Sequence, residues 1–206
     1  MPASTPFIWR GNSNISLGNP AAIFPILAEW LPHQADLLEI GSGAGQHAIH
    51  MAGELKHIAW QPSDRASVLP ILNNNIAAYG STNILTPITL DLAEDIWPAG
   101  TFHCVYSANV MHIVSRELGE KLIRGAAKAL AVDGLLILYG PYKYAGNFTT
   151  PSNADFDLWL KERDAQSGIR DFEWVRDLAL QCGLVLLEDR PMPANNQLLL
   201  FSARQQ

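Results

Sequence analysis

The sequence predicts an α/β fold, in which a mostly parallel sheet is covered by helices on both faces. From residue 36 onward, signals for short strands alternate with signals for helices, which is the pattern of strands linked by helical crossovers. The expected strands are apolar along their whole length, as is typical of strands buried on both faces. Only residues 188–197 separate the last two expected strands. That connection is too short for a parallel crossover and predicts that these two strands pair antiparallel.

Residues 1–18 precede this pattern and are rich in Gly, Asn and Ser, so we expect an irregular N-terminal arm. Asn19 and Pro20 resemble a helix cap followed by proline in the first turn, and Pro32 is expected to end that helix. Pro25 falls inside the segment and predicts either a kink or a later start.

The alternating elements follow in order after the first helix. Ser115 is the expected cap of the helix after the fourth strand, residues 152–155 resemble a capping box for the next helix, and Gly183 is expected to stop the last one. The expected strands are residues 37–40, 58–61, 84–90, 102–107, 135–139, 184–187 and 198–201. The buried face of the helix after Ser115 is expected to consist of Leu118, Leu122, Ile123, Ala126 and Leu130.

Composition fits one globular domain, which we expect over residues 1–206 with the α/β core over residues 36–206. The formal net charge is −6, which opposes binding to the phosphates of nucleic acids. Cys104 and Cys182 lie far apart without metal-ligand spacing, so neither a disulfide framework nor a zinc site is expected. No apolar run reaches the length of a membrane span and no signal-peptide pattern begins the chain, so we expect a cytoplasmic protein without a membrane partner.

A glycine-rich loop follows the first strand of the core and opens a helix. It reads Glu39-Ile40-Gly41-Ser42-Gly43-Ala44-Gly45. Glycines let the backbone turn tightly and approach a ligand closely, and the helix N-terminus adds free N–H groups. A nucleotide-type ligand is therefore expected, although a turn with only a packing role is the alternative.

The spacing of the glycines distinguishes between cofactors. A dinucleotide fingerprint, GxGxxG, requires glycine at position 46, where this chain has Gln46. Glu39 stands two residues before Gly41, and a carboxylate there suits an ammonium group better than a pyrophosphate. This favours S-adenosylmethionine, whose methionine end carries an ammonium group.

Two further acids follow strands. Asp64 lies after the second strand, close to the spacing of a ribose-binding carboxylate, and its alternative role is to cap the next helix. Asp91 and Leu92 close the third strand, where a side chain can read an adenine amino group. The alternative is that Asp91 is only an exposed acidic residue in a turn.

The glycine loop, Asp64 and Asp91 together resemble the class I S-adenosylmethionine-dependent methyltransferases. The resemblance implies a Rossmann-like fold with a mostly parallel seven-stranded sheet, an antiparallel last strand and helices on both faces. It also implies S-adenosylmethionine as the cofactor. The cofactor-binding residues it implies are Glu39, Gly41, Ser42, Gly43, Gly45, Asp64, Asp91, Leu92 and Asn109.

Several strings narrow the resemblance to the methyltransferase-like 26 family, which implies no substrate. The N-terminal arm departs from that family, which is expected to carry a charged Glu-Arg-Asn stretch where this chain has residues 17–21. The strings are residues 60–64, 108–113, 139–143, 150–154, 168–171 and 192–196.

Candidate catalytic and substrate-binding groups follow the strands at the edge where ligands bind in open α/β sheets. His112 is the first choice for a general base, because an unperturbed imidazole titrates near pH 6.5. The alternative is a histidine packed behind the cofactor. Tyr142 is expected to orient the substrate or to wall the pocket. The candidate substrate-binding residues are Asn153, Asn195 and Asn196, which alternatively only form turns.

The expected partner is a small-molecule substrate, and the oligomeric state is left open. His47 and His50 lie three residues apart on one helix without a third ligand, so no metal site is expected. Two other functional classes compete with the methyltransferase. One is a nicotinamide-dependent oxidoreductase on the same kind of sheet, and the other is a non-catalytic module that keeps the cofactor pocket. A structural domain with an empty cleft is a third possibility.

Overall fold

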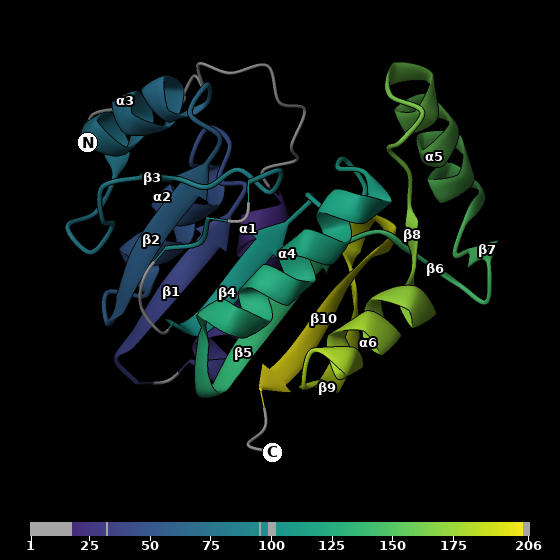
Figure 1. Cartoon of the computed structure of the whole chain (residues 1–206). Coiled ribbons are helices and arrows are strands. Elements are labelled where there is room, and N and C mark those ends of the chain that lie inside the picture. The colour runs from purple at the N-terminus through teal and green to yellow at the C-terminus, as the bar shows by residue number, and fades with distance from the viewer. Residues whose placement is uncertain (1–17, 32, 95, 99–101, 204–206) are drawn as a thin grey trace.

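The protein is described by a computed structural model that covers residues 18–31, 33–94, 96–98 and 102–203 (Figure 1). The expected irregular arm falls almost wholly outside these residues. The α-helices are α1 (Gly18–Trp30), α2 (Gln46–Glu54), α3 (Leu69–Tyr79), α4 (Arg116–Ala129), α5 (Pro151–Arg163) and α6 (Phe172–Gln181). A 3₁₀ turn, η1, spans Pro193–Asn195. The strands are β1 (Ala35–Ile40), β2 (Ile58–Asp64), β3 (Ile88–Thr89), β4 (Phe102–Ala108), β5 (Leu130–Gly140), β6 (Tyr142–Tyr144), β7 (Asn147–Phe148), β8 (Arg170–Asp171), β9 (Leu184–Met192) and β10 (Asn196–Ala203).

The main sheet has seven strands in the order β3-β2-β1-β4-β5-β10-β9. The pairs from β3 to β5 are all parallel, whereas β10 is antiparallel to both β5 and β9. The predicted fold class is therefore confirmed, including the antiparallel last strand. A second sheet, β7-β6-β8, has three short strands, and none of them was predicted because each has only two or three residues.

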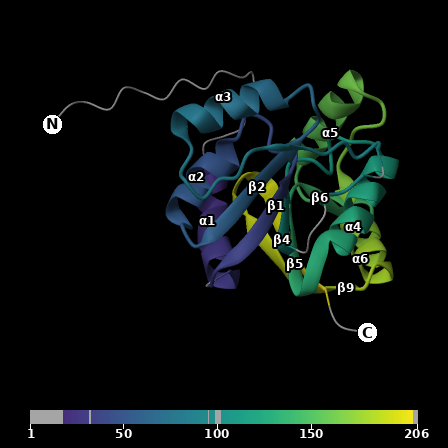
Figure 2. The same ribbon diagram turned by 60° about the vertical axis from the view of Figure 1, so that its left-hand side comes forward.

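Helices cover both faces of the main sheet (Figure 2), and its central strands β1, β4 and β5 are buried along most of their length. Adjacent residues of one strand enter opposite cores, because successive side chains point to opposite faces. In β1, Leu37 packs with α1 and α2, while Leu38 packs with α4 and α6. The apolar run that the sequence shows is thus explained by two cores that share one sheet.

Two helix boundaries differ from the predictions. α1 begins at Gly18, so Asn19 lies within the helix and is not its cap. α5 begins one residue before the expected capping box, because the side chain of Thr150 accepts a hydrogen bond from the backbone N–H of Asn153 and makes Thr150 the cap. A threonine followed by proline is a common helix start, and this pair lies directly before residues 152–155.

Other boundaries are confirmed. Ser115 caps α4 by accepting a hydrogen bond from the N–H of Leu118, and Gly183 follows α6 with a φ of +80°. Of the expected buried face of α4, Leu122, Ile123 and Ala126 are buried and Leu118 is half-buried. Leu130, also buried, is already the first residue of β5.

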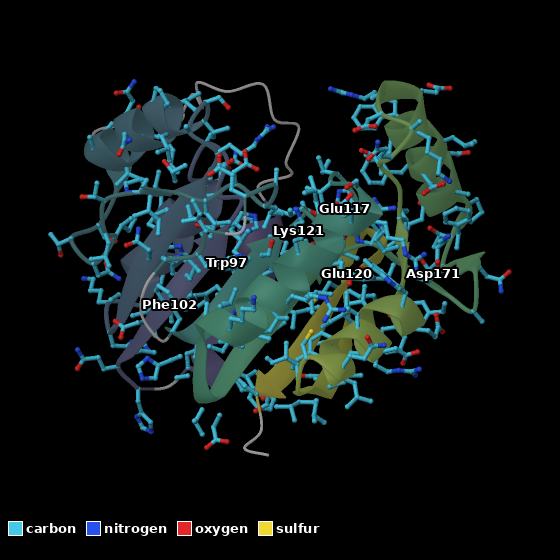
Figure 3. The ribbon with its side chains drawn as sticks, viewed as in Figure 1. Trp97, Phe102, Glu117, Glu120, Lys121 and Asp171 are labelled. Carbon is cyan, nitrogen blue, oxygen red and sulfur yellow. The ribbon has the colours of Figure 1, made fainter. Side chains whose placement is uncertain are left out.

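Ala93 and Trp97, which precede β4 in the chain, contact α4 (Figure 3). The ring of Trp97 lies against Gly125, where an added Cβ would come within 1.7 Å of the Trp97 Cζ2 atom. Lys121 of the same helix donates a hydrogen bond to the carbonyl of Ala93 at 3.2 Å. A glycine is therefore needed at position 125. Among the residues that the structure describes, no helix is both long enough and apolar enough to cross a bilayer.

Candidate active site

The loop between β1 and α2 takes a backbone shape that glycine permits. Gly41, Gly43 and Gly45 have φ angles of +74°, +56° and +85°, values that side chains with a Cβ rarely adopt. Gly41 also approaches the turn after β4, because an added Cβ would lie 2.5 Å from Val110 Cγ2. At Gly43, by contrast, an added Cβ would meet nothing within 4 Å. The loop thus leaves open space at its tip.

Glu39 lies beneath this loop and is only 3% exposed. Its Oε2 atom accepts hydrogen bonds from Ser42 Oγ and Trp60 Nε1, both at 2.9 Å. Burial raises the pKa of the Glu39 carboxyl to about 7, and the two hydrogen bonds only partly offset this effect. No hydrogen bond to the described residues occupies Oε1.

The end of β2 holds the loop in place. The carbonyl of Ser63 accepts hydrogen bonds from the N–H groups of Gly41 and Ser42, both at 3.0 Å. Asp64 Oδ2 accepts from the N–H of Gly43 at 2.8 Å, and Oδ1 accepts from the N–H of Arg65 at 2.7 Å. Each oxygen keeps a lone pair for a ligand hydroxyl. Asp64 does not cap the following helix, because α3 starts at Leu69 without a side-chain cap.

A small cavity of about 40 Å³ opens at the loop. It is far smaller than a nucleoside, so it can hold only part of a nucleotide-type cofactor. His47 forms one wall and its Nδ1 lies 2.5 Å from the hydroxyl of Tyr106. Burial lowers the pKa of His47 to about 4, so this imidazole is neutral at pH 7. The lining residues are Glu39, Gly41, Ser42, Gly43, Ala44, Gln46, His47, Ala108 and Asn109.

Asp91 and Leu92 do not line this cavity or the larger one described below. Asp91 Oδ1 accepts a hydrogen bond from the N–H of Ala93 at 2.9 Å, which is the geometry of a turn acid. Leu92 is buried in the core on the α4 side. Their assignment to the cofactor stays a prediction.

A larger cavity, of about 280 Å³, lies beside the first. It brings together the ends of β4 and β5, the first turns of α5 and the turn before β10. Of the described residues, Asn109 alone lines both cavities, and its left-handed backbone (φ +60°) turns the chain sharply after β4. The lining residues are Asn109, His112, Pro141, Ser152, Asn153, Phe156, Ala194 and Asn196.

His112 is a wall of this larger cavity and is 4% exposed. Its ring meets the ring of Phe156 edge to face, with 5.4 Å between the centroids. Burial and, to a smaller extent, the positive charge of Arg170 lower the pKa of His112 to about 4. The imidazole is therefore neutral at pH 7, with one nitrogen that can accept a proton.

The turn that carries His112 is held by a segment about 55 residues later in the chain. The carbonyls of residues 111–114 all accept hydrogen bonds from residues 167–170, so the whole turn is anchored from one side. The bonds run from Arg170 Nε to Met111 (3.1 Å), from the N–H of Gly168 to His112 (2.9 Å), from Ser167 Oγ to Ile113 (2.5 Å), and from Arg170 Nη2 to Val114. We call residues 167–170 the clamp.

The remaining candidates divide between the cavity and its surroundings. Asn153 and Asn196 line the larger cavity. Asn195 is exposed and lies behind it, where its carbonyl accepts from Asn153 and its side chain donates to Ser152. Tyr142 is 1% exposed, packs in the core and has a buried hydroxyl without a hydrogen-bond partner. Tyr142 therefore does not reach the larger cavity.

The sequence reasoning missed several side chains that shape the site. Trp60, Phe156 and Arg170 had no assigned role there, although Trp60 and Arg170 fall in the strings that carried the family resemblance. Nothing in the sequence brings residues 167–170 next to residues 111–114, because that contact depends on tertiary structure. Among the described residues, no group of three His, Cys, Asp or Glu side chains is arranged to hold a metal ion.

A protein family matches the chain over residues 13–203, and its description is "Protein of unknown function (DUF938)". The chain belongs to this family. Several solved structures with the same fold are named as methyltransferases. An O-methyltransferase family protein from Burkholderia thailandensis superposes with a TM-score of 0.80 at 14% identity, over 92% of this chain and 57% of that one.

Two further structures agree with this match. An O-methyltransferase family 2 protein from Planctomyces limnophilus, in complex with apigenin, gives a TM-score of 0.72 at 21% identity, over 84% of this chain and 52% of that one. PigF with SAH gives 0.76 at 15%, over 89% and 54%. The DUF938 chain thus spans little more than half the length of these proteins, and such low identities establish a shared fold only. The narrower resemblance to the methyltransferase-like 26 family stays a prediction.

Proposed function

We propose that this DUF938 protein is an S-adenosylmethionine-dependent methyltransferase that acts on a small molecule. The observation that carries the proposal is the meeting of two cavities at Asn109. One is walled by the glycine loop and a buried carboxylate, and the other by a neutral histidine and polar side chains. A methyl donor held at the first cavity would face a substrate held in the second, and such positioning accounts for much of the rate of a transfer reaction.

The residues at the glycine loop fit the cofactor. Glu39 offers an unbonded carboxylate oxygen to an ammonium group, and Gly43 leaves open space at the tip of the loop. Asp64 has lone pairs for ribose hydroxyls in addition to its bonds to the backbone. SAH appears in one structure with this fold, that of PigF.

His112 is the proposed proton acceptor. When bound, S-adenosylmethionine supplies a methyl group whose bond to sulfur breaks, with its electron pair kept by sulfur, as the bond to the nucleophile forms. His112 takes the proton that the nucleophile loses. Because its pKa is about 4, it accepts this proton late, once the new bond has made the nucleophile strongly acidic. Asn109, which borders both cavities, is placed to orient the nucleophile.

A calorimetric titration tests the cofactor. The ligands are S-adenosylmethionine, S-adenosylhomocysteine and NADH, and the proteins are the wild type, Asp64→Ala and the control Asp36→Ala. Asp36 is an exposed carboxylate at the opposite end of the strands. The proposal requires that the first two ligands bind, that NADH does not, and that only Asp64→Ala weakens binding. Binding of NADH alone would replace the methyltransferase with an oxidoreductase, and no binding would reject the cofactor assignment.

A further inference from the structure

We infer that the larger cavity selects an uncharged substrate that donates at least two hydrogen bonds, such as a small diol or amino alcohol in its neutral form. This inference rests on the proposed function, because it names the substrate class of the same site. It follows from the direction in which two asparagine side chains of the cavity, those of Asn153 and Asn196, are held. An amide can offer either protons or an oxygen to a ligand, so its orientation decides which groups the cavity accepts.

Asn153 presents an oxygen to the cavity. Its Nδ2 atom donates one proton to Thr149 Oγ1 at 2.8 Å and the other to the carbonyl of Asn195 at 3.0 Å. A carbonyl can only accept, so this contact fixes which end of the amide is nitrogen. Both protons are used within the protein, and Oδ1 has no partner among the described residues. Asn153 can therefore only accept a hydrogen bond from a substrate.

Asn196 is held in the same way from the other side of the cavity. Its Nδ2 atom donates to the hydroxyl of Tyr139 at 3.0 Å and to the carbonyl of Pro193 at 3.2 Å. The carbonyl of Pro193 again fixes the orientation of the amide. Two asparagines from different elements, α5 and β10, thus offer acceptors and withhold donors.

Among the residues that the structure describes, the rest of the lining has no charge. None of the eight residues that form the cavity is Asp, Glu, Lys or Arg, and His112 is neutral at pH 7 because burial lowers its pKa to about 4. A charged ligand would find no opposite charge in this lining to replace any hydration that it loses. Pro141 and Phe156 supply apolar walls. The volume of about 280 Å³ lies near the lower limit of small-molecule pockets, so the substrate is small.

The N-terminus of α5, by contrast, favours a negatively charged ligand. The first turn of α5 borders the cavity through Ser152 and Asn153, and a helix N-terminus attracts anions. Thr150 already accepts the N–H of Asn153, and the Oδ1 atoms of Asn153 and Asn196 would repel a carboxylate. We therefore expect acceptor oxygens to outweigh the helix end.

A ladder of matched aromatic probes separates these preferences. The probes are benzene-1,2-diol, its monomethyl ether, its dimethyl ether and 2-hydroxybenzoate. Binding is followed through the ring resonances of His112 by NMR, with assignment from His112→Gln. The inference requires that affinity falls with each methylated hydroxyl and that the carboxylate binds more weakly than the diol. A carboxylate that binds more tightly, a dimethyl ether equal to the diol, or no binding by any probe would overturn it.

Two variants locate the effect. Asn196→Leu removes one acceptor, and we expect the preference for the diol over the dimethyl ether to fall by about two- to tenfold, the usual range for one hydrogen bond. Asn74→Leu makes the same substitution at an exposed asparagine of α3 that lines neither cavity, and we expect that preference to be unchanged. An equal fall in both variants would contradict the assignment. If Asn196→Leu does not fold, the ladder on the wild type decides.

S-Adenosylhomocysteine is titrated into the same samples, which keeps the two proposals separable. If it binds and the ladder fails, the substrate class is wrong and the methyltransferase proposal stands. If it does not bind and the ladder holds, the cavity selects donors but the protein is not a methyltransferase of the proposed kind.

Discussion

Replacement of Glu39 with glutamine should change how the stability of the protein depends on pH. Burial raises the pKa of Glu39 from 4.5 to about 7, so between these pH values the folded state holds a proton that the unfolded state releases. The contribution of Glu39 to the free energy of unfolding therefore falls as pH rises from 4.5 to above 7. The rise from 4.5 to about 7 corresponds to about 3 kcal/mol in the free energy of unfolding. Solvent screens this contribution little, because Glu39 is 3% exposed.

Urea unfolding followed by tryptophan fluorescence measures this effect at pH 4.5, 6 and 8. The difference between Glu39→Gln and wild type should move in favour of the variant by about 3 kcal/mol from the lowest to the highest pH, because other titrating groups are common to both proteins. Glu54→Gln, at the exposed end of α2, should give a difference that is flat with pH. A flat difference for Glu39→Gln as well would refute the buried, proton-binding carboxyl.

Three further results are expected. Affinity for S-adenosylhomocysteine should fall about tenfold from pH 8 to pH 6 by calorimetry, because the ionised fraction of Glu39 falls from about nine tenths to one tenth, and Glu39→Gln should lose this dependence. Arg170→Gln should raise the pKa of His112 in an NMR titration, since the repelling charge is removed, whereas Arg170→Lys, which keeps the charge, should raise it less; equal values would contradict the role of the charge. Gly125→Ala should lower the free energy of unfolding by about 1–3 kcal/mol through overpacking against Trp97. The control Gly53→Ala, where an added Cβ meets nothing within 4 Å, should raise it by about 0.4–1 kcal/mol. A loss of stability in both variants would mean that the contact with Trp97 is not the cause.

The mostly parallel sheet could be predicted because burial on both faces leaves a plain signal in the sequence, and the antiparallel pairing of the last two strands could be predicted from their short connection. Apolar runs such as residues 37–40 and 102–107 needed no knowledge of tertiary structure. The short strands β6 to β8 could not be predicted, because two or three residues show no periodicity. The cap of α5 was expected at Ser152 and is Thr150. Serine and threonine both suit a helix cap, so residue type alone does not distinguish the two positions.

The candidate site divides in the same way. The glycine loop and Asp64 are local in sequence, and the structure brings them together through the hydrogen bond between Asp64 and Gly43. The larger cavity is assembled from segments between positions 109 and 196, so its lining depends on how distant elements pack. Phe156 forms a wall beside His112 only because α5 lies next to the turn after β4.

The clamp has a consequence for how this site can change in evolution. Every acceptor on the His112 turn is a backbone carbonyl, and every residue has one. The donors, by contrast, depend on the side chains of Ser167 and Arg170 and on the tight space at Gly168, where an added Cβ would lie 2.9 Å from Asp157 Oδ1. The side chain at position 112 can therefore change, and with it the reaction, while the position of the turn is maintained by residues that do not line the larger cavity. We expect the anchoring segment to be kept even in relatives that lack a histidine at this position.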